Sequence, residues 1–324
     1  MEPAIVFDCG SNYIKAGFSI KNSNYDKRVR FNDEIPIAKI PILIGRPLNL
    51  HNGLIKNVNF KPLMIDDEIT PVRDYLNLSR PIENGIIVDE EDTSFLYEYI
   101  LNKKLGLSSS DLKNRKLLMT CLPEETEKNI TKKCEIIFDK IGLGYCNFES
   151  RAKTSLYSEG EHSGTVLDSG FDNTYAIPIY ESYTFEHQIR KVDFGGKHIT
   201  DYLIRLLQIR GYSLNSIADF DNINEIKEKL CFISGDFWSD KKLDDETAYY
   251  YSQIKLPDGN KISISGEKFK APEILFKPWL INNPHSGIHE ILFDCINVSK
   301  ILFKLLFYSH AILILEKIYI IRFI

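Results

Sequence analysis

The stretch IVFDCGS at residues 5–11 decides the fold class, because TVLDSGF at residues 165–171 repeats its pattern. Each copy is a short apolar run followed by Asp-x-Gly, and each continues into a second strand-like stretch, residues 14–19 and residues 175–179. Two strand–turn–strand units with glycine at the tip predict two related lobes that face each other. On this pattern alone coincidence is the alternative, because Asp and Gly are common turn residues.

The segments that follow each repeat alternate between helical and strand patterns, as an α/β fold requires. Apolar spacing, Gly and Pro mark their limits. The expected elements are helices at residues 93–104, 124–141, 200–210 and 223–233, a buried strand at 116–120, and a hairpin turn at 256–259. Residues 48–78 have weak periodicity, which predicts a small, mobile appendage.

Composition excludes several classes of protein. The 324 residues carry a formal net charge of -5, so a nucleic-acid-binding surface rich in Lys and Arg is not expected. The six cysteines form no C-x-x-C pair, which favours reduced thiols in the cytosol over metal ligation or a disulfide framework. Strand-like residues begin already at Ala4, so we expect no secretory signal. The longest uncharged run near the C-terminus, residues 305–315, is about half of the roughly 20 residues that a membrane span needs.

The first Asp-x-Gly-Ser turn has the residue types that a polyphosphate site requires. Gly10 allows close backbone approach, consecutive amide N–H groups form an anion-binding concavity, and Ser11 adds a hydroxyl donor. Lys15 follows on the returning strand and supplies a positive charge. Asp8 and Asp168 would repel phosphate but suit a hydrated divalent cation. Ordinary turn chemistry is the alternative for both aspartates.

The segment DCGSNYIKAGF at residues 8–18 resembles the first phosphate loop of actin and the actin-related proteins. The resemblance continues in order from about residue 4 to residue 313. The other matching blocks are IGRP (44–47), RPIENGI (80–86), DSG (168–170), IPIYE (177–181), TDYL (200–203), RGYS (210–213), IKEKLC (226–231), LPDG (256–259), APEILFKP (271–278) and SGIHE (286–290).

This resemblance implies an actin-like ATPase fold of the duplicated ribonuclease H-like type, with two α/β lobes around a nucleotide cleft. The first lobe would span residues 1–150, with a small insert at about 46–80. The second would span residues 151–324, with a helical insert at about 196–270.

The resemblance also implies ATP or ADP with Mg²⁺ or Ca²⁺ as cofactors. The implied phosphate ligands are Gly10, Ser11, Asn12, Lys15, Gly170 and Asp172, with Asp8 and Asp168 holding the cation through water. Gly196, Lys227 and Glu228 match nucleoside-binding positions, although a solvated helix face is the alternative for Lys227 and Glu228. Asn224 stands where the family usually has a basic residue, so we expect one contact to be lost.

Several positions depart from the family pattern. The family's glutamine that orients the attacking water is aligned with Glu135, whose carboxylate would either be repelled by phosphate or act as a base. Phe171 replaces a water-ordering carboxylate, Asp172 replaces a glycine beside phosphate, and Asn12 replaces a glycine in the first loop. These changes predict weak or absent hydrolysis and leave ATPase activity an open question.

The C-terminal end departs further. Residues 304–313 follow the family's helix and strand, but Ile314-Leu315-Glu316 stands where a turn of the Ser-Gly-Gly type is expected. We therefore expect the second lobe to lack the family's C-terminal segments, with exposed apolar surface as the consequence. An incomplete or misread gene is the alternative.

Two functions follow from the resemblance. The first is a cytoskeletal protein that binds nucleotide and assembles with itself, actin or partner proteins, supported by the insert at 48–78. The second is a non-polymerising scaffold subunit of a motor-adaptor or chromatin complex, supported by the altered catalytic positions and by the KAPE sequence at 270–273. The expected partners are actin, actin-related subunits and actin-binding proteins. The expected location is the cytoplasm and cytoskeleton, with a nuclear complex as the alternative.

Overall fold

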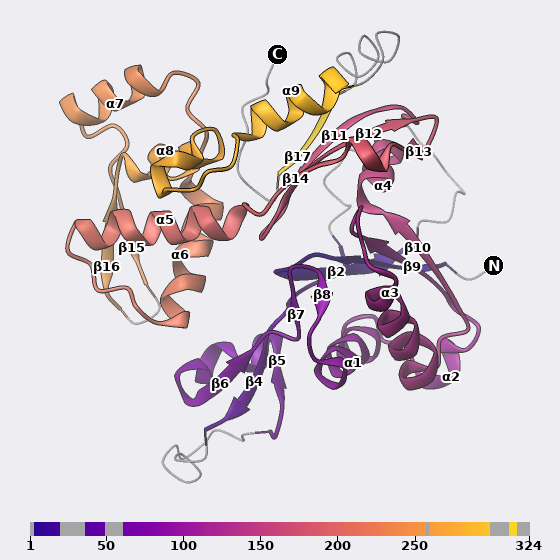
Figure 1. Cartoon of the computed structure of the whole chain (residues 1–324). Helices are drawn as coiled ribbons and strands as arrows, with labels where there is room; N and C mark the ends of the chain where they lie inside the picture. Colours follow the sequence, from indigo (N-terminus) through magenta and orange to yellow (C-terminus); the bar gives the residue numbers. More distant parts are fainter. Residues whose placement is uncertain (1–2, 20–35, 49–60, 257–258, 299–310, 316–324) are drawn as a thin grey trace, which may run out of the picture. The chain divides into compact units, whose positions relative to one another are not determined.

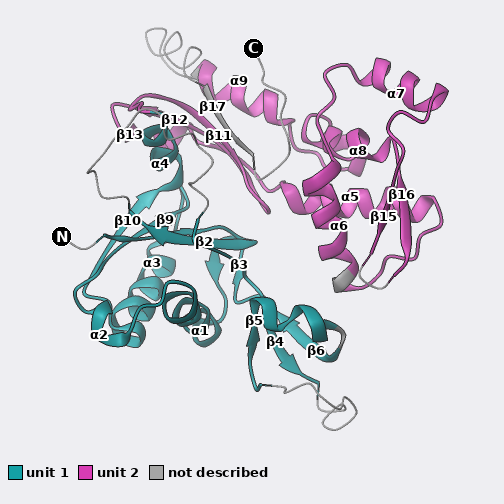
Figure 2. Cartoon of the chain, turned by 180° about the vertical axis from the view of Figure 1, so that it is seen from behind, with its two compact units in different colours: residues 1–159 teal, residues 160–324 magenta. Residues whose placement is uncertain are grey.

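The computed structural model describes residues 3–19, 36–48, 61–256, 259–298 and 311–315. The chain divides into two compact units, residues 1–159 and residues 160–324 (Figures 1 and 2). The sequence placed the boundary at 150/151. Each unit has its own five-stranded sheet and its own buried core, so each is described separately.

The sheet of the first unit has the strand order β10-β9-β1-β2-β3. Its strands are β1 (Ile5–Cys9), β2 (Tyr13–Phe18), β3 (Ala38–Pro41), β9 (Lys116–Cys121) and β10 (Tyr145–Ser150). Strand β1 pairs antiparallel with β2 and parallel with β9, and β9 pairs parallel with β10. The short strand predicted at the start of 5–11 and the strands predicted at 14–19 and 116–120 are confirmed as β1, β2 and β9.

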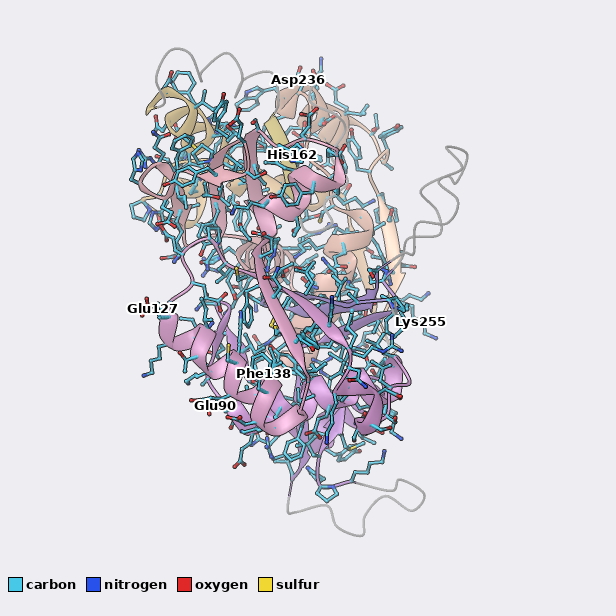
Figure 3. The ribbon with its side chains drawn as sticks, turned by 90° about the vertical axis from the view of Figure 1, so that its right-hand side faces the viewer. Glu90, Glu127, Phe138, His162, Asp236 and Lys255 are labelled. Atoms are coloured by element: carbon cyan, nitrogen blue, oxygen red, sulfur yellow. The ribbon has the colours of Figure 1, made fainter. Side chains whose placement is uncertain are left out.

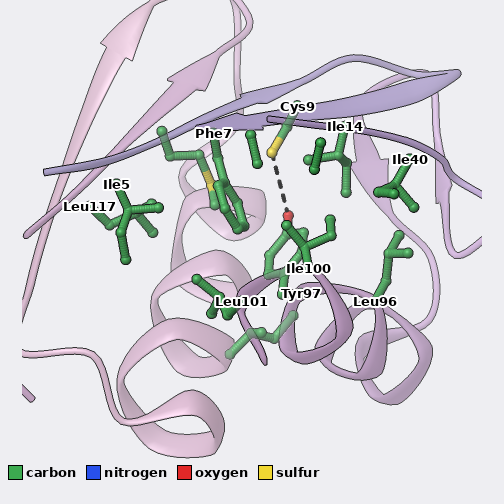
Figure 4. Close-up of a cluster of buried hydrophobic side chains, with 14 of the residues drawn as sticks. Ile5, Phe7, Cys9, Ile14, Ile40, Leu96, Tyr97, Ile100, Leu101 and Leu117 are labelled. Atoms are coloured by element: carbon green, nitrogen blue, oxygen red, sulfur yellow. Dashed lines mark hydrogen bonds between the residues drawn. The ribbon is translucent and has the colours of Figure 1, made fainter. Parts of the chain in front are cut away.

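Two helical segments cover one face of this sheet. They are α1 (Glu90–Tyr99) with its π-helical continuation Ile100–Lys104, and α3 (Glu127–Cys134) with its π-helical continuation Glu135–Ile141. Figure 4 shows Ile5, Phe7 and Ile14 of the sheet above Leu96 and Tyr97 of α1. The Tyr97 ring meets Phe7 edge-on with 5.7 Å between ring centroids. These apolar contacts fix β1 and β2 against the helices.

Both helices begin at a residue other than the predicted one, and side-chain caps explain why. The Asp89 carboxylate accepts the N–H of Asp92, so α1 begins at Glu90 and not at 93. The Thr126 hydroxyl accepts the N–H of Asn129, so α3 begins at Glu127 and not at 124.

A small three-stranded sheet, ordered β5-β4-β6, lies within the insert expected at about 46–80. Its strands are β4 (Ile44–Pro47), β5 (Met64–Ile65) and β6 (Leu76–Ser79). Arg46 of β4 forms a bidentate ion pair with the buried Asp92 of α1, which joins this sheet to the body of the first unit. Residues 49–60 of the insert lie outside the described residues. The remaining elements of the unit are β7 (Ile82–Glu83), β8 (Ile86–Ile87), α2 (Ser109–Leu112) and α4 (Arg151–Ser158).

The sheet of the second unit has the order β13-β12-β11-β17, with β14 also paired to β12. Its strands are β11 (Gly164–Ser169), β12 (Thr174–Tyr180), β13 (Tyr183–Thr184), β14 (Arg190–Val192) and β17 (Ala311–Leu315). Strand β11 is buried along its whole length, antiparallel to β12 and parallel to β17. Residues 314 and 315, at the position where the resemblance implies a Ser-Gly-Gly turn, belong to β17. Residues 299–310 and 316–324 lie outside the described residues.

Helices and a hairpin make up the rest of the described part of this unit. They are α5 (Gly196–Ile209), α6 (Ile217–Leu230), α7 (Phe237–Glu246), α8 (Glu267–Lys270) and α9 (Ile288–Val298), with the hairpin β15 (Ser252–Lys255) and β16 (Lys261–Ile264). The helices predicted at 200–210 and 223–233 are confirmed as α5 and α6, although each begins earlier in the chain. Residues 257 and 258 of the predicted hairpin turn lie outside the described residues, while the pairing of β15 with β16 is confirmed. No helix in the described part of the chain is long and apolar enough to cross a bilayer.

Candidate functional site

The first candidate element is the turn between β1 and β2. The N–H of Gly10 donates to the carbonyl of Tyr13 at 3.1 Å, which closes the turn. A Cβ atom at Gly10 would lie only 3.0 Å from that carbonyl, so the tight turn favours glycine. The N–H groups of Ser11 and Asn12 donate to no acceptor among the residues that the structure describes. Two adjacent free amides at a glycine turn form an anion-binding concavity.

Asn12 is part of the framework of this turn. Its side chain is buried, and its amide oxygen accepts from Nη1 of Arg80 at 3.2 Å. Its backbone carbonyl accepts the N–H of Ile42 at 2.8 Å. The side chain and the carbonyl of Asn12 therefore hold the turn in place, and its backbone N–H remains without an acceptor among the described residues.

Asp8 is the penultimate residue of β1, next to the turn, and lies opposite Lys15 of β2 in the strand register. Oδ2 of Asp8 is 3.5 Å from Nζ of Lys15, while Oδ1 accepts from the Thr120 hydroxyl at 2.8 Å and lies 3.3 Å from Nε of Arg151. Burial raises the pKa of Asp8, but Arg151, Lys15 and the Thr120 hydroxyl outweigh burial and hold that pKa below its usual value. Asp8 is thus an ionised carboxylate between two cations.

Arg151 and Thr120 also contact Asp8, and the sequence patterns did not predict either contact. Arg151 is the first residue of α4, and its Nη2 donates to the carbonyl of Cys9 at 2.9 Å. Thr120 lies near the end of β9 and also accepts the N–H of Cys9 at 3.2 Å. The strand topology could have indicated these contacts. Strands β1, β9 and β10 are parallel, so their carboxyl ends meet at one edge of the sheet.

Glu135 lies away from these contacts. It begins the π-helical continuation of α3, where its side chain is exposed while Ile136 and Ile137 are buried. Figure 3 labels Glu127 and Phe138 on the same helical segment. The side chains around Asp8 come from β2, β9 and α4 and do not include Glu135. The role of Glu135 as a catalytic residue stays a prediction.

The second candidate element is the turn between β11 and β12, which closes in the same way. The N–H of Gly170 donates to the carbonyl of Asn173 at 2.9 Å. Asp168 is buried on β11 and lies opposite Tyr175 in the register. The corresponding partner in the first hairpin is Lys15, so only the first hairpin carries a cation opposite its aspartate.

The N-terminus of α5 is bound to the tip of this second hairpin. The N–H groups of Gly196 and Lys197 donate to the carbonyls of Gly170 and Phe171 at 2.9 and 2.8 Å. A Cβ atom on Gly195 would lie 2.5 Å from the carbonyl oxygen of Gly170, so this approach requires glycine.

The side chain of Phe171 packs inside the second unit. It is 6% exposed, and its ring meets that of Phe220 on α6 edge-on with 6.2 Å between centroids. The adjacent Asp172 is half-buried. The ring is thus buried against α6 and offers no oxygen atom that could order a water molecule.

A buried polar network lies beneath the N-terminus of α5. Nζ of Lys227 donates to the carbonyl of Gly196 at 2.9 Å and to Oδ1 of Asn224 at 2.8 Å. Asn224 in turn donates to Glu228 at 3.1 Å and accepts from the Thr200 hydroxyl at 3.1 Å. Lys227 is 3% exposed, so it does not belong to a solvated helix face.

The structure therefore brings the predicted residues together in two groups, one in each unit. The first group is Asp8, Gly10, Ser11, Asn12 and Lys15 in the β1–β2 hairpin; the second is Asp168, Gly170, Asp172, Gly196, Lys227 and Glu228 around the β11–β12 hairpin and the start of α5. Within the described ranges, three or more His, Cys, Asp or Glu side chains nowhere gather in a way that could hold a metal ion by themselves.

Comparison with known proteins gives a consistent result. A family model described as Actin matches residues 1–314. The chain is similar to proteins named actin-related protein 2: it is 36% identical to that of Schizosaccharomyces pombe over 302 residues, which is 93% of this chain and 74% of that protein. It is 37% identical to that of Saccharomyces cerevisiae over 298 residues (92% and 73%). It is 34% identical to that of Acanthamoeba castellanii over 309 residues (95% and 76%).

Proposed function

The chain belongs to the actin family and has the actin-like ATPase fold, and on this basis we propose that it binds ATP or ADP with a divalent cation, Mg²⁺ or Ca²⁺. One observation carries the proposal. The β1–β2 turn presents the N–H groups of Ser11 and Asn12, which have no acceptor within the described ranges, beside the half-exposed ammonium of Lys15. These are donors of the kind that phosphate oxygens accept.

We propose that both hairpins hold phosphate groups. In the first, Gly10 permits close approach, the amides of Ser11 and Asn12 donate, and Lys15 supplies charge. In the second, Gly170 and Asp172 are the proposed contacts. The anionic Asp172 acts there through its backbone, because its carboxylate would repel a phosphate.

The proposed divalent cation neutralises phosphate charge, and the carboxylates of Asp8 and Asp168 would hold its water molecules. Asp8 offers hard oxygen atoms of the type that such cations prefer. Both of its oxygens also contact protein donors, namely Lys15, Thr120 and Arg151. This arrangement suits contact through water better than direct ligation.

For the nucleoside we propose Gly196, Lys227 and Glu228. The buried network described above supports this, since it fixes Lys227 against the carbonyl of Gly196 and orients Glu228 through Asn224. Asn224 takes the place of a basic residue, but Lys227 keeps one positive charge within the network.

We propose weak or absent hydrolysis of the bound ATP. Phe171 is buried and apolar, so it cannot position water, and the exposed Glu135 lies outside the contacts of the first hairpin. A positioned base contributes about 10²–10⁴-fold in rate, so its loss would make turnover slow. Quantifying phosphate release from purified protein with ATP and Mg²⁺ tests this.

We propose that the protein assembles with actin, with actin-related subunits or with actin-binding proteins, in the cytoplasm and on the cytoskeleton. The similarity to proteins named actin-related protein 2 also supports the second candidate, a non-polymerising actin-related scaffold subunit. Sedimentation with ATP and Mg²⁺ separates the two. A pellet above a critical concentration of the protein alone, or pelleting together with actin, supports the first candidate, whereas no pelleting in either case supports the scaffold.

Nucleotide retention tests the binding proposal. Protein purified under native conditions is denatured with acid, and the released nucleotide is separated by chromatography and quantified. We expect close to one ATP or ADP per chain. Absence of nucleotide, together with no increase in melting temperature when ATP and Mg²⁺ are added, would contradict the proposal.

A further inference from the structure

Arg151 is the most buried of three charged side chains at the first hairpin, the other two being Asp8 and Lys15. Its side chain is 17% exposed, compared with 31% for Asp8 and 38% for Lys15. Its guanidinium links α4 to the end of β1, two segments that are far apart in the sequence. Nη2 donates to the carbonyl of Cys9, and Nε lies 3.3 Å from Oδ1 of Asp8. Arg151 therefore contacts both the backbone and the carboxylate at the end of β1.

The position of Arg151 is fixed by the fold. It is the first residue of α4, and its backbone carbonyl accepts from the hydroxyls of Thr154 and Ser155 at 2.8 and 2.9 Å. The residue before it, Ser150, ends β10, so the backbone of Arg151 lies at a strand–helix junction and not in a loop. Its charge is thus in place without any ligand.

The charge at the hairpin determines whether a polyphosphate can bind there without a metal cation. A lone carboxylate beside a polyphosphate repels it unless a cation lies between them. Here two cationic side chains, Lys15 and Arg151, lie within 3.5 Å of the single carboxylate of Asp8. Among these three described side chains, the positive charges therefore outnumber the negative charge by one. A guanidinium keeps that charge at every pH of interest and is weakly hydrated.

We propose that Arg151 is a built-in counterion of Asp8 that lowers the dependence of nucleotide binding on the divalent cation. The inference rests on the proposed nucleotide-binding function and specifies the ligand form, since the site would accept a metal-free nucleoside triphosphate. Arg151 is a positioning and specificity residue here: it acts through Asp8 and through the carbonyl of Cys9.

The test measures the dissociation constant of ATP by titration calorimetry with the full chain, in excess Mg²⁺ and in EDTA. For the wild-type chain we expect a ratio of the two constants below about fivefold, the lower end of ordinary coupling between two ligands. For Arg151→Gln we expect the ratio to increase by at least about tenfold, because Asp8 then needs the metal to offset its charge. Arg151→Lys keeps the charge and should restore most of the wild-type ratio.

Lys153→Gln is the matched control. Lys153 lies two residues along the same helix, has an ion pair with Glu149 at 3.6 Å, and contributes the same unit of charge away from Asp8. Removal of the Lys153 charge should leave the ratio of the two dissociation constants unchanged. If loss of any positive charge were enough, the ratio would change equally in both variants.

The outcomes separate the two proposals. If the wild-type chain fails to bind ATP even with Mg²⁺, the proposed function itself is wrong. If it binds with Mg²⁺ but loses most of its affinity in EDTA, only the inference about Arg151 is wrong, and this result needs no variant to fold. The inference also fails if Arg151→Gln shows the wild-type ratio.

Discussion

The N–H of Gly196 donates to the carbonyl of Gly170 at 2.9 Å, so the first residue of α5 is bonded to the tip of the second hairpin. The N–H of Lys197 makes the same kind of bond to Phe171. Helix N-termini leave backbone N–H groups without helical partners, and here two of them are satisfied by the turn. The conformation of the turn and the start of the helix therefore depend on each other.

Gly195→Ala should break this junction. The new Cβ would lie 2.5 Å from the carbonyl oxygen of Gly170 and 2.7 Å from that of Phe171, and backbone atoms cannot rotate away as a side chain can. We expect a loss of about 1–3 kcal/mol in the free energy of unfolding, the usual range for an overpacked site. Urea denaturation followed by circular dichroism measures it.

Gly235→Ala is the control, because a Cβ there meets nothing within 4 Å. Its urea midpoint should stay close to that of the wild-type chain. Equal midpoints for Gly195→Ala and the wild-type chain would show that the junction tolerates a side chain.

Phe171→Asp, which places a carboxylate back at this position, should destabilise the second unit and not simply restore hydrolysis. Phe171 is 6% exposed and packs on Phe220, and truncation of a buried phenylalanine alone costs about 3–5 kcal/mol. We expect a loss of at least that size in thermal or urea unfolding. A variant with wild-type stability and rapid phosphate release would contradict this account of the substitution.

Lys133→Met should be among the most destabilising single changes in the first unit. Nζ of Lys133 lies 2.5 Å from the Glu125 carboxylate, with the side chains 5% and 3% exposed. Removing one partner of a buried ion pair costs about 3–5 kcal/mol, because the other charge is left without compensation. The free energy of unfolding in urea measures the effect.

Two variants sharpen that comparison. Glu125→Gln combined with Lys133→Met should recover part of the loss, since no lone charge remains buried. Lys229→Met removes an exposed pair with Glu225 and should cost about 0.3–0.5 kcal/mol at most. Similar losses from Lys133→Met and Lys229→Met would refute the importance of burial.

His198 should make the stability of the second unit depend on pH. Burial lowers the pKa of His198 in spite of the nearby Asp201, and Nδ1 of the neutral ring accepts the N–H of Gly195 at 3.2 Å. The unfolded chain, with an ordinary histidine pKa of about 6.5, takes up this proton more readily than the folded chain. This contribution to stability is therefore complete above about pH 7 and is lost as the pH falls below about 6.5 toward the folded-state pKa.

Thermal unfolding between about pH 7.5 and pH 5.5 checks the sign of this effect. Replacement of His198 by Asn keeps a side-chain acceptor but removes the titration, so the melting temperature of that variant should fall less on acidification. His162→Asn changes an exposed histidine, labelled in Figure 3, and should leave the wild-type pH dependence intact. A steeper acid loss in the His198 variant would reverse the predicted sign.

Local sequence was sufficient to predict the two hairpins. In both, an apolar strand, an Asp-x-Gly turn and a returning strand are contiguous in the chain, so β1–β2 and β11–β12 follow from residues 5–19 and 164–180. The helix starts were less well predicted, because the caps Asp89 and Thr126 lie outside the apolar pattern. Tyr97 and its contacts depended on packing that a periodic pattern does not specify.

The charged surroundings of Asp8 could not be predicted from local sequence. The Thr120 hydroxyl that binds Asp8 is 112 positions away in the chain, and Arg151 is 142 positions from the Cys9 carbonyl that it binds. Only the sheet order β10-β9-β1 brings these residues to one edge. Likewise, the replacement at Phe171 looked like the loss of a catalytic group, and its contact with Phe220 gives it a packing role as well.

The central claim is that the β1–β2 turn and Lys15 bind a polyphosphate, and the ATP affinity of Lys15→Met tests it most directly. Lys15 supplies a charge-assisted contact worth about 1.5–3 kcal/mol, so the dissociation constant measured by titration calorimetry in Mg²⁺ should rise about 10- to 100-fold. Lys116→Met changes an exposed lysine at the first residue of β9, at the other end of that strand from Thr120. It should leave that constant unchanged. Equal affinities for the Lys15→Met variant and the wild-type chain would contradict the claim.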